Sequence, residues 1–295
     1  MVRTPRLIWS VMTSAALAAG AFAATVAPGA AASAATVHPG VQTFTNGGQC
    51  TANFIFSDGT SSYIGQAAHC SSTGSSTQTD GCTTQSLPLG TPVVILGASK
   101  PGTLAYNSWI AMQQVHETDP NACAYNDLAL VRIDPADVDK IDSSVPHWGG
   151  PVGLNTSGAP AGSAVYSYGN SILRGGVTLL SPKVGTSGGD IGAGWSHMVT
   201  TVTPGIPGDS GSGFLDANGN ALGDLSTVAV SVPGGVNNNV SDLSHELQYL
   251  NSHPTGLAPV QLVNGRVAFN ASAIPLDTAN PVDNPVGGLS NFLGV

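Results

Sequence analysis

The sequence predicts an all-β fold built from short antiparallel strands. Glycine and proline make up almost a fifth of the 295 residues, with 38 glycines and 20 prolines, which favours many turns over long helices. From Thr51 onward, short apolar or alternating runs recur at even spacing between turn residues. This pattern is typical of an antiparallel barrel or sandwich. Hydrophobic residues account for 41% of the chain, enough for a sizeable core.

The expected strands fall into two groups. Residues 134–161 contain several prolines and glycines and few strand signals, so we interpret them as a connection between two halves. The strands expected before the connection are Thr51–Ser57, Tyr63–Ala68, Val93–Leu96 and Leu128–Ile133. The strands expected after it are Ala164–Tyr168, Val177–Leu180, His197–Val202, Gly213–Asp216 and Thr227–Val232.

The last expected elements are one helix and one hairpin. Leu243, Leu247 and Leu250 fall on one helical face, and Ser241 or Asp242 is suited to cap the helix. Beyond the helix, an Asn-Gly pair between alternating residues predicts a hairpin over Val260–Phe269, followed by a tail.

The first residues have the three parts of a secretory signal. Arg3 and Arg6 precede an uncharged stretch, Leu7–Ala27, and small residues follow, ending at Ala34. We therefore predict a signal peptide over residues 1–34, with cleavage after Ala23 as the alternative site. An N-terminal membrane anchor is the competing interpretation. The mature chain is expected to be secreted and extracellular, with no stable membrane association after signal removal.

The charge balance excludes one class of partner. Lys and Arg number 8 and Asp and Glu number 17, which gives a net charge of −9. A chain this acidic lacks the basic footprint that nucleic-acid binding requires, so no nucleic-acid partner is expected. A polybasic membrane patch is absent for the same reason.

The cysteines suggest disulfides. There are four, Cys50, Cys70, Cys82 and Cys123, and an even count in an exported chain suggests two bridges. The sequence alone allows three pairings. A zinc site is the competing interpretation, but the chain has no Cys-x-x-Cys pair to support it.

Three short motifs carry residues suited to acyl transfer. They are Ala-Ala-His-Cys ending at Cys70, Asn-Asp-Leu-Ala-Leu starting at Asn126, and Gly-Asp-Ser-Gly starting at Gly208. Acyl transfer needs a nucleophile, a base that takes its proton, and a group that orients the base. Ser210, His69 and Asp127 supply these catalytic roles, and Asp134 is the rival orienting acid.

The same order of motifs resembles the secreted bacterial chymotrypsin-like (trypsin-fold) serine proteases. The resemblance spans about Gln49 to Leu250. It implies two antiparallel β-barrels with a C-terminal helix, and a Ser-His-Asp triad in the cleft between them. The domains are then a first half at 35–150, a second half at 151–252 that includes the helix, and an extra hairpin and tail at 253–295.

The resemblance also implies roles for residues around the triad. The N–H groups of Gly208 and Ser210 would form an oxyanion hole. Ser226 would support Asp127; the competing interpretation is that Ser226 is an ordinary serine of a strand. It implies the disulfide Cys50–Cys70 and, with it, Cys82–Cys123. Pro204 stands where members specific for Arg and Lys have an aspartate, so that specificity has no support here.

One acidic residue in the third motif needs a counterion. Animal members pair the aspartate before the nucleophile, here Asp209, with a freed N-terminus. The stretch ahead of Cys50 is too short for that arrangement. We hypothesise that Arg174 balances Asp209 instead.

The function expected from these residues is that of a serine endopeptidase. It would hydrolyse protein or peptide substrates through an acyl-enzyme intermediate, with no metal and no organic cofactor, and as a monomer. The alternatives are an esterase acting on small activated esters, and a secreted binding module without catalysis.

Overall fold

The structure is a computed structural model that describes residues 35–75, 78–231, 235–253 and 256–273. The expected signal peptide, Val232 and the tail after Ala273 lie outside the described residues. Within the described residues, no helix combines the length and the apolar character needed to cross a bilayer.

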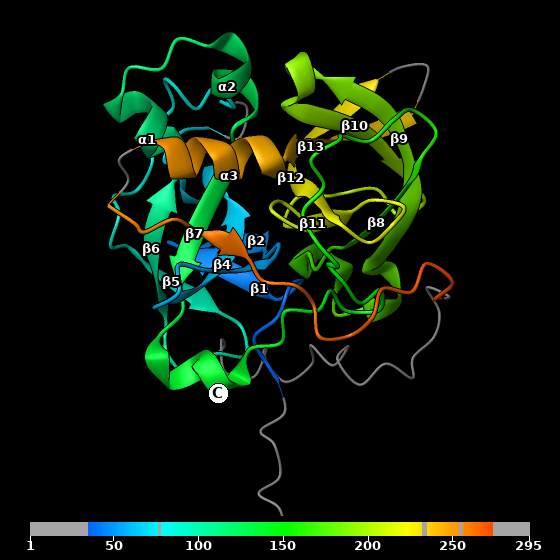
Figure 1. Cartoon of the computed structure of the whole chain (residues 1–295), viewed down its shortest axis with the longest axis horizontal. Helices are drawn as coiled ribbons and strands as arrows, with labels where there is room; N and C mark the ends of the chain where they lie inside the picture. Colours follow the sequence, from blue (N-terminus) through cyan, green and yellow to red (C-terminus); the bar gives the residue numbers. More distant parts are fainter. Residues whose placement is uncertain (1–34, 76–77, 232–234, 254–255, 274–295) are drawn as a thin grey trace, which may run out of the picture. The chain divides into compact units, whose positions relative to one another are not determined.

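The first half is an eight-stranded antiparallel sheet in the order β14-β3-β4-β7-β6-β5-β1-β2 (Figure 1). Its strands are β1 (Gln42–Thr45), β2 (Gly48–Thr51), β3 (Ile55–Ser57), β4 (Ser62–Ala67), β5 (Pro92–Ile95), β6 (Gly102–Asn107), β7 (Leu128–Arg132) and β14 (Gln261–Leu262). Its helical segments are η1 (Ala68–Ser71), α1 (Ser108–Gln114), α2 (Pro120–Tyr125) and η2 (Pro135–Lys140).

The second half is a closed antiparallel barrel in the order β10-β13-β12-β11-β8-β9. Its strands are β8 (Ala164–Tyr168), β9 (Pro182–Ile191), β10 (Ser196–Thr201), β11 (Gly213–Leu215), β12 (Ala221–Ser231) and β13 (Gly235–Asp242). Its 3-10 turns are η3 (Ile172–Arg174), η4 (Thr178–Leu180) and η5 (Gly192–Gly194). The antiparallel β class is confirmed, and the barrel closes in this half, while the first half forms the sheet described above.

The predicted helix α3 (Leu243–Ser252) connects the two halves. It begins after Asp242, whose carboxylate accepts a hydrogen bond from the His245 N–H at 2.8 Å. It packs against β12 and β13, while the Tyr249 hydroxyl donates to Glu117 of the first half at 3.0 Å (Figure 1). The apolar face of the helix is therefore buried where the two halves meet.

Two predicted strands are wrong. The run Thr51–Ser57 contains two strands, because Asn53 is buried between them and its side chain accepts the N–H of Phe54 at 2.7 Å. The run Val177–Leu180 is a 3-10 turn that leaves its apolar side chains exposed. It follows Gly175 and Gly176, both with positive φ, which interrupt any extended backbone there.

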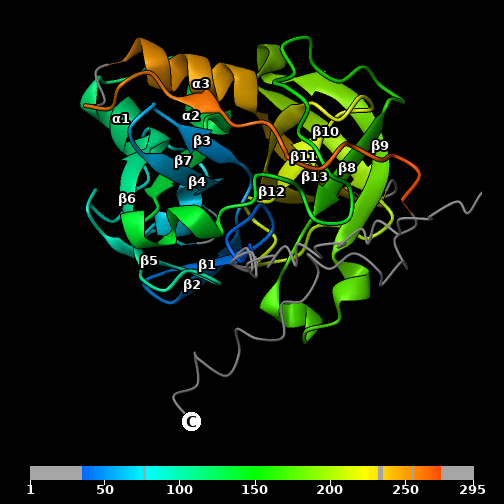
Figure 2. The same cartoon turned by 60° about the horizontal axis from the view of Figure 1, so that its bottom comes forward.

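The predicted hairpin over Val260–Phe269 is also wrong. β14 pairs with β3 and not with a second strand of the tail. The Asn264-Gly265 pair contacts the connection between the halves, because the Asn264 carbonyl accepts Ser143 Oγ at 2.6 Å and the Gly265 N–H donates to Pro151 at 2.7 Å. Figure 2 shows this segment running from β3 toward the barrel. The open edge of β3 is thus covered by the tail.

Candidate active site

The pairing of β4 with β7 brings His69 and Asp127 together. The strands are antiparallel, and Ala67 at the end of β4 lies opposite Leu128 at the start of β7. Asp127 immediately precedes β7, and His69 lies in η1 immediately after β4. The Ala68 N–H donates to the Asp127 carbonyl, which fixes the two chain ends side by side.

The Asp127 carboxylate accepts three hydrogen bonds. Its Oδ2 lies 2.7 Å from His69 Nδ1 and 2.6 Å from Ser226 Oγ, and its Oδ1 accepts the His69 N–H at 2.9 Å. Ser226 reaches Asp127 because the register of β12 against β13 shifts between Leu225 and Thr227. Such a bulge re-aims one side chain. The carboxylate is therefore held on the Nδ1 side of the imidazole, the side that leaves Nε2 free to act as a base.

His69 is tuned by opposing effects. Burial lowers the pKa of its imidazole, whereas the charge of Asp127 and the hydrogen bond to it raise that pKa. The net result is a pKa above the ordinary 6.5. The side chain is 26% exposed, so a substrate has access to it. A raised pKa strengthens the imidazole as a base, and proton transfer to a positioned base is what general-base catalysis requires.

Ser210 lies on a turn that packs against the strand leading to His69. The Ser210 carbonyl accepts the Thr51 N–H at 2.9 Å, and the Gly211 N–H donates to Leu225 at 2.7 Å. A Cβ on Gly211 would lie 2.6 Å from the Ala67 nitrogen, so only glycine allows this approach. Among the residues that the structure describes, no hydrogen bond joins Ser210 Oγ to His69. In enzymes without substrate, the hydrogen bond between a nucleophile and its base is often long.

The turn before Ser210 exposes backbone N–H groups. Gly208 has φ +94, and its carbonyl accepts Gln49 Nε2 at 2.9 Å and Thr51 Oγ1 at 2.8 Å. A Cβ at Gly208 would meet Gln49 Oε1 at 2.1 Å. Neither the Gly208 N–H nor the Ser210 N–H donates to any group within the described residues. Two N–H groups without internal acceptors beside a serine form a site suited to a developing oxyanion.

Two disulfides brace the first half. Cys50 is bonded to Cys70, next to His69, and Cys82 is bonded to Cys123, which joins the loop between η1 and β5 to α2. These are the pairs that the resemblance implies. The first of them ties the His69 turn to β2, from which Thr51 reaches Ser210.

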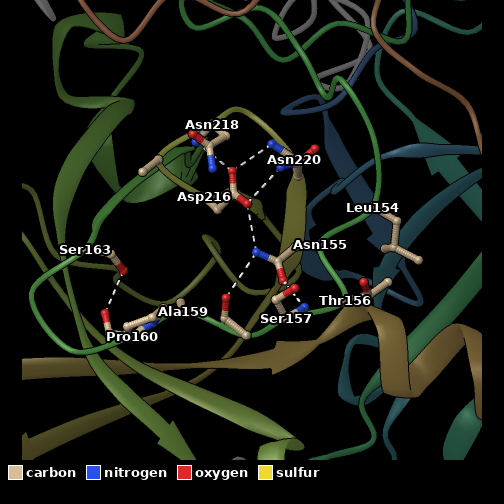
Figure 3. A pocket seen from close by; sticks show the side chains of 12 residues that line it. Leu154, Asn155, Thr156, Ser157, Ala159, Pro160, Ser163, Asp216, Asn218 and Asn220 are labelled. Atoms are coloured by element: carbon tan, nitrogen blue, oxygen red, sulfur yellow. Dashed lines mark hydrogen bonds between the residues drawn. The ribbon is translucent and has the colours of Figure 1, made fainter.

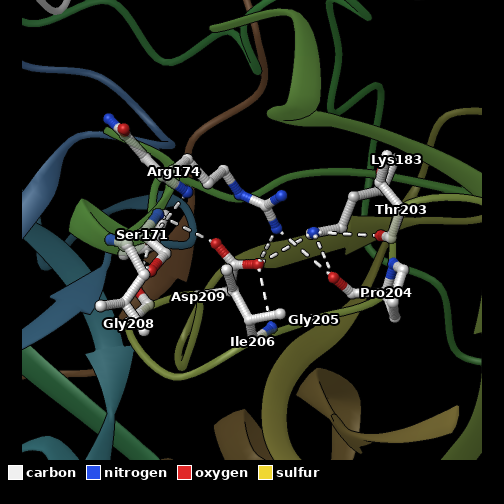
Figure 4. A network of polar contacts seen from close by, with 12 residues as sticks. Ser171, Arg174, Lys183, Thr203, Pro204, Gly205, Ile206, Gly208 and Asp209 are labelled. Carbon is white, nitrogen blue, oxygen red and sulfur yellow. Dashed lines mark hydrogen bonds and ion pairs between the residues drawn. The ribbon is translucent and has the colours of Figure 1, made fainter. Parts of the chain in front are cut away.

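Asp209 is surrounded by cations. Its carboxylate forms ion pairs with Arg174 and, at 2.9 Å, with Lys183 Nζ (Figure 4). The hypothesised contact between Arg174 and Asp209 is therefore present. Lys183 also donates to the Thr203 carbonyl at 3.1 Å and to the Pro204 carbonyl at 3.2 Å. The two cations therefore join Asp209 to the backbone at Thr203 and Pro204.

Lys183 is an unusual lysine. Its side chain is fully buried, and burial lowers its pKa to about 8, although the charge of Asp209 acts in the opposite direction and Arg174 lowers the pKa further. Sequence reasoning missed this residue because β9 contains three glycines among its ten residues and was not predicted as a strand. The small number of basic residues in the chain was the signal that could have identified Lys183 as a partner of Asp209.

Sequence reasoning also missed two carboxyl groups behind Asp127. Glu246 Oε1 accepts the Asp127 N–H at 2.8 Å, and both Glu246 and Asp224 are fully buried. Glu246 follows Leu243 by three residues, and it therefore lies on the apolar face of α3. A glutamate on the apolar face of a helix was the signal for a buried carboxyl group.

A hollow of about 340 Å³ lies elsewhere, between residues 154–163 and the turn at residues 216–220 (Figure 3). Asp216 is at its centre and accepts Asn155 Nδ2 at 2.7 Å, Asn220 Nδ2 at 3.0 Å and the N–H groups of Asn218 and Asn220. Because both carboxylate oxygens are occupied by N–H donors, Asp216 holds the turn in place and offers no free ligand atom.

No protein-family model and no curated protein matches the chain. Among solved structures, Thermobifida fusca protease A is 20% identical, with 78% of this chain and 99% of that chain covered and a TM-score of 0.49. A Cellulomonas bogoriensis chymotrypsin is 20% identical over 77% and 98%, with a TM-score of 0.48. A Nocardiopsis protease is 20% identical over 77% and 98%, with a TM-score of 0.46.

Proposed function

We propose that this chain is a secreted serine endopeptidase that forms an acyl-enzyme intermediate on Ser210. The observation that carries the proposal is the hydrogen-bonded series from Ser226 through Asp127 to His69, beside a serine whose turn has free N–H groups. An orienting acid, a base and a nucleophile are the groups that peptide-bond hydrolysis needs.

The reaction follows from the position of each group. Ser210 Oγ attacks the scissile carbonyl while His69 Nε2 takes its proton. The carbonyl oxygen becomes an oxyanion that accepts hydrogen bonds from the Gly208 and Ser210 N–H groups. Asp127 stabilises the imidazolium, which then protonates the leaving amine. A water molecule, activated by the same base, hydrolyses the acyl-enzyme and restores Ser210.

Export of the chain has its own support. All four cysteines are joined in disulfides, and disulfides persist in oxidising compartments outside the cytosol. The basic, apolar and small-residue parts of residues 1–34 support the same proposal. The secreted protein is then expected to lack Met1, which mass spectrometry of the intact chain measures.

The test compares Ser210→Ala with Ser212→Ala, a matched change in the same turn. Hydrolysis of an unstructured polypeptide is expected to fall by about 10⁶-fold in kcat for Ser210→Ala and to persist in Ser212→Ala. The wild type should gain activity as His69 loses its proton, with a midpoint above pH 6.5 because the pKa of His69 is raised. Cleavage of activated esters alone would identify an esterase, and undiminished proteolysis by Ser210→Ala would refute the proposal.

A further inference from the structure

Two buried carboxyl groups lie on the side of Asp127 that faces away from solvent. Glu246 projects from α3 and accepts the Asp127 N–H through Oε1 at 2.8 Å. Asp224 lies in β12, two residues before Ser226, and its side chain interacts with that of Glu246. Both residues have no exposed surface. The triad described above uses neither of them.

Among the described residues, no cationic side chain forms an ion pair with Glu246 or Asp224. The titratable groups that act on the pair are Asp127 before β7 and Tyr106 on β6. Apart from the contact between the two carboxyl groups, no side chain of the described residues donates a hydrogen bond to Glu246 Oε2 or to either carboxyl oxygen of Asp224. A buried carboxylate without a cation or a donor is strongly disfavoured, so the pair must retain a proton.

The pKa directions agree with this geometry. Burial raises the pKa of Glu246 well above its ordinary value and the charge of Asp224 raises it further, against the hydrogen bond from Asp127. Burial and the charge of Asp127 also raise the pKa of Asp224, whereas the hydrogen bond from Glu246 lowers it. Both directions favour a pair that keeps a proton, and Glu246 Oε2, unlike Oε1, accepts no hydrogen bond from the backbone and is free to carry that proton.

We propose that Glu246 keeps its carboxyl proton while the enzyme works and acts as the positioning residue for Asp127. Protonated Glu246 donates from Oε2 to Asp224 and accepts the Asp127 N–H at Oε1, so one neutral side chain links β12 to the start of β7. Asp127 then remains the anion that faces His69, and the carboxyl group that accepts the Asp127 N–H is neutral. This inference rests on the proposed function, because it assigns the pair to the base of that triad.

Two substitutions of Glu246 distinguish the effect of its proton from the effect of its side-chain volume. Glu246→Gln keeps an acceptor for the Asp127 N–H and a donor for Asp224, so it imitates the protonated acid. Glu246→Leu keeps much of the volume and removes both hydrogen bonds. We expect the Gln variant to retain most of the wild-type kcat at neutral pH and the Leu variant to lose on the order of 10- to 100-fold, since small displacements of catalytic groups have effects of that size. Similar large losses in both variants would overturn the proposal.

Infrared spectroscopy reports the proton independently of activity. The C=O stretch of a protonated carboxyl group lies well above the carboxylate bands, and the difference spectrum of wild type against Glu246→Gln at neutral pH should contain one such band. Glu117→Gln, a matched change in the first half, should leave that band in place. A difference spectrum with only carboxylate bands would refute the protonated state, even if the Leu variant does not fold. If the wild type did not hydrolyse the substrate, the proposed function would be refuted. The infrared result would still show whether Glu246 is protonated.

Discussion

Asp127 and Asp209 are both buried aspartates near Ser210, and their surroundings have opposite charge. Asp209 contacts two cations, Arg174 and Lys183. Asp127 contacts no lysine or arginine within the described residues; its carboxylate is held by His69 and Ser226, and two further carboxyl groups lie behind it. The difference teaches that one anion is neutralised so that a turn keeps its shape, while the other is held by hydrogen bonds so that its charge remains available to His69.

The two arrangements suit two kinds of work. A fixed ion pair such as that of Asp209 joins elements, here β9 and η3 to the turn that carries Gly208 and Ser210. An anion that must stabilise a developing imidazolium gains from having no competing cation.

Asp127→Asn removes the charge and keeps the shape. The asparagine amide favours the wrong imidazole tautomer, so kcat is expected to fall by about 10⁴-fold. Asp134→Asn is the control, because Asp134 caps η2 by accepting the Ala136 N–H and lies outside the site. Steady-state kinetics on a peptide substrate measures both. Equal kcat values for the Asp127→Asn and Asp134→Asn variants would contradict the role of Asp127 in the triad.

Asp209→Asn leaves two buried cations without their anion. Breaking a buried ion pair from one side costs about 3–5 kcal/mol of the free energy of unfolding, which urea denaturation measures. The double variant Asp209→Asn with Lys183→Met has one buried cation fewer and should recover part of that loss. Additive losses in the double variant would show that Lys183 and Asp209 act independently.

Arg174→Ala and Lys183→Met each leave Asp209 with one cation. Each is expected to lower kcat/KM by a factor between a few-fold and about 100-fold, because the turn carrying Ser210 is displaced and not removed. The combined variant should lose more than the product of the single effects, since Asp209 is then unpaired. Full activity of Arg174→Ala would contradict the role of Arg174.

Glu246→Gln should change how stability depends on pH. The pKa of Glu246 is raised in the folded chain, so the folded form holds a proton that the unfolded form releases above about pH 4.5. The wild type should therefore lose stability as pH rises from that value, by at most about 1.4 kcal/mol per pH unit for this proton. The Gln variant lacks this loss. Parallel curves of unfolding free energy against pH would contradict a raised pKa.

The residues proposed for the site depend less on the fold than the strands around them. His69, Asp127 and Ser210 each stand in a contiguous motif, so the sequence alone proposes their roles. Lys183 and Glu246 contribute through contacts with residues far away in the chain, and no local pattern defines such contacts. The search for a counterion to Asp209 identified Arg174 because basic residues are few.

The wrong strand predictions have a physical cause. Val177–Leu180 is apolar like a strand, but the glycines before it and the exposed surface around it favour a 3-10 turn. β9 is a strand although it contains three glycines, because pairing with both β8 and β10 closes the barrel. Tertiary pairing likewise makes β14 a strand on the open edge of β3.

The central claim is that His69, Asp127 and Ser210 work together as one catalytic unit. Reaction of the secreted protein with a fluorophosphonate, followed by mass spectrometry of the labelled peptide, tests it most directly. We predict a single label on Ser210 that is lost in His69→Ala, with Ser212→Ala labelled as the wild type is. An unlabelled Ser210 in folded protein free of its signal peptide, or equal labelling of the His69→Ala variant, would contradict the account.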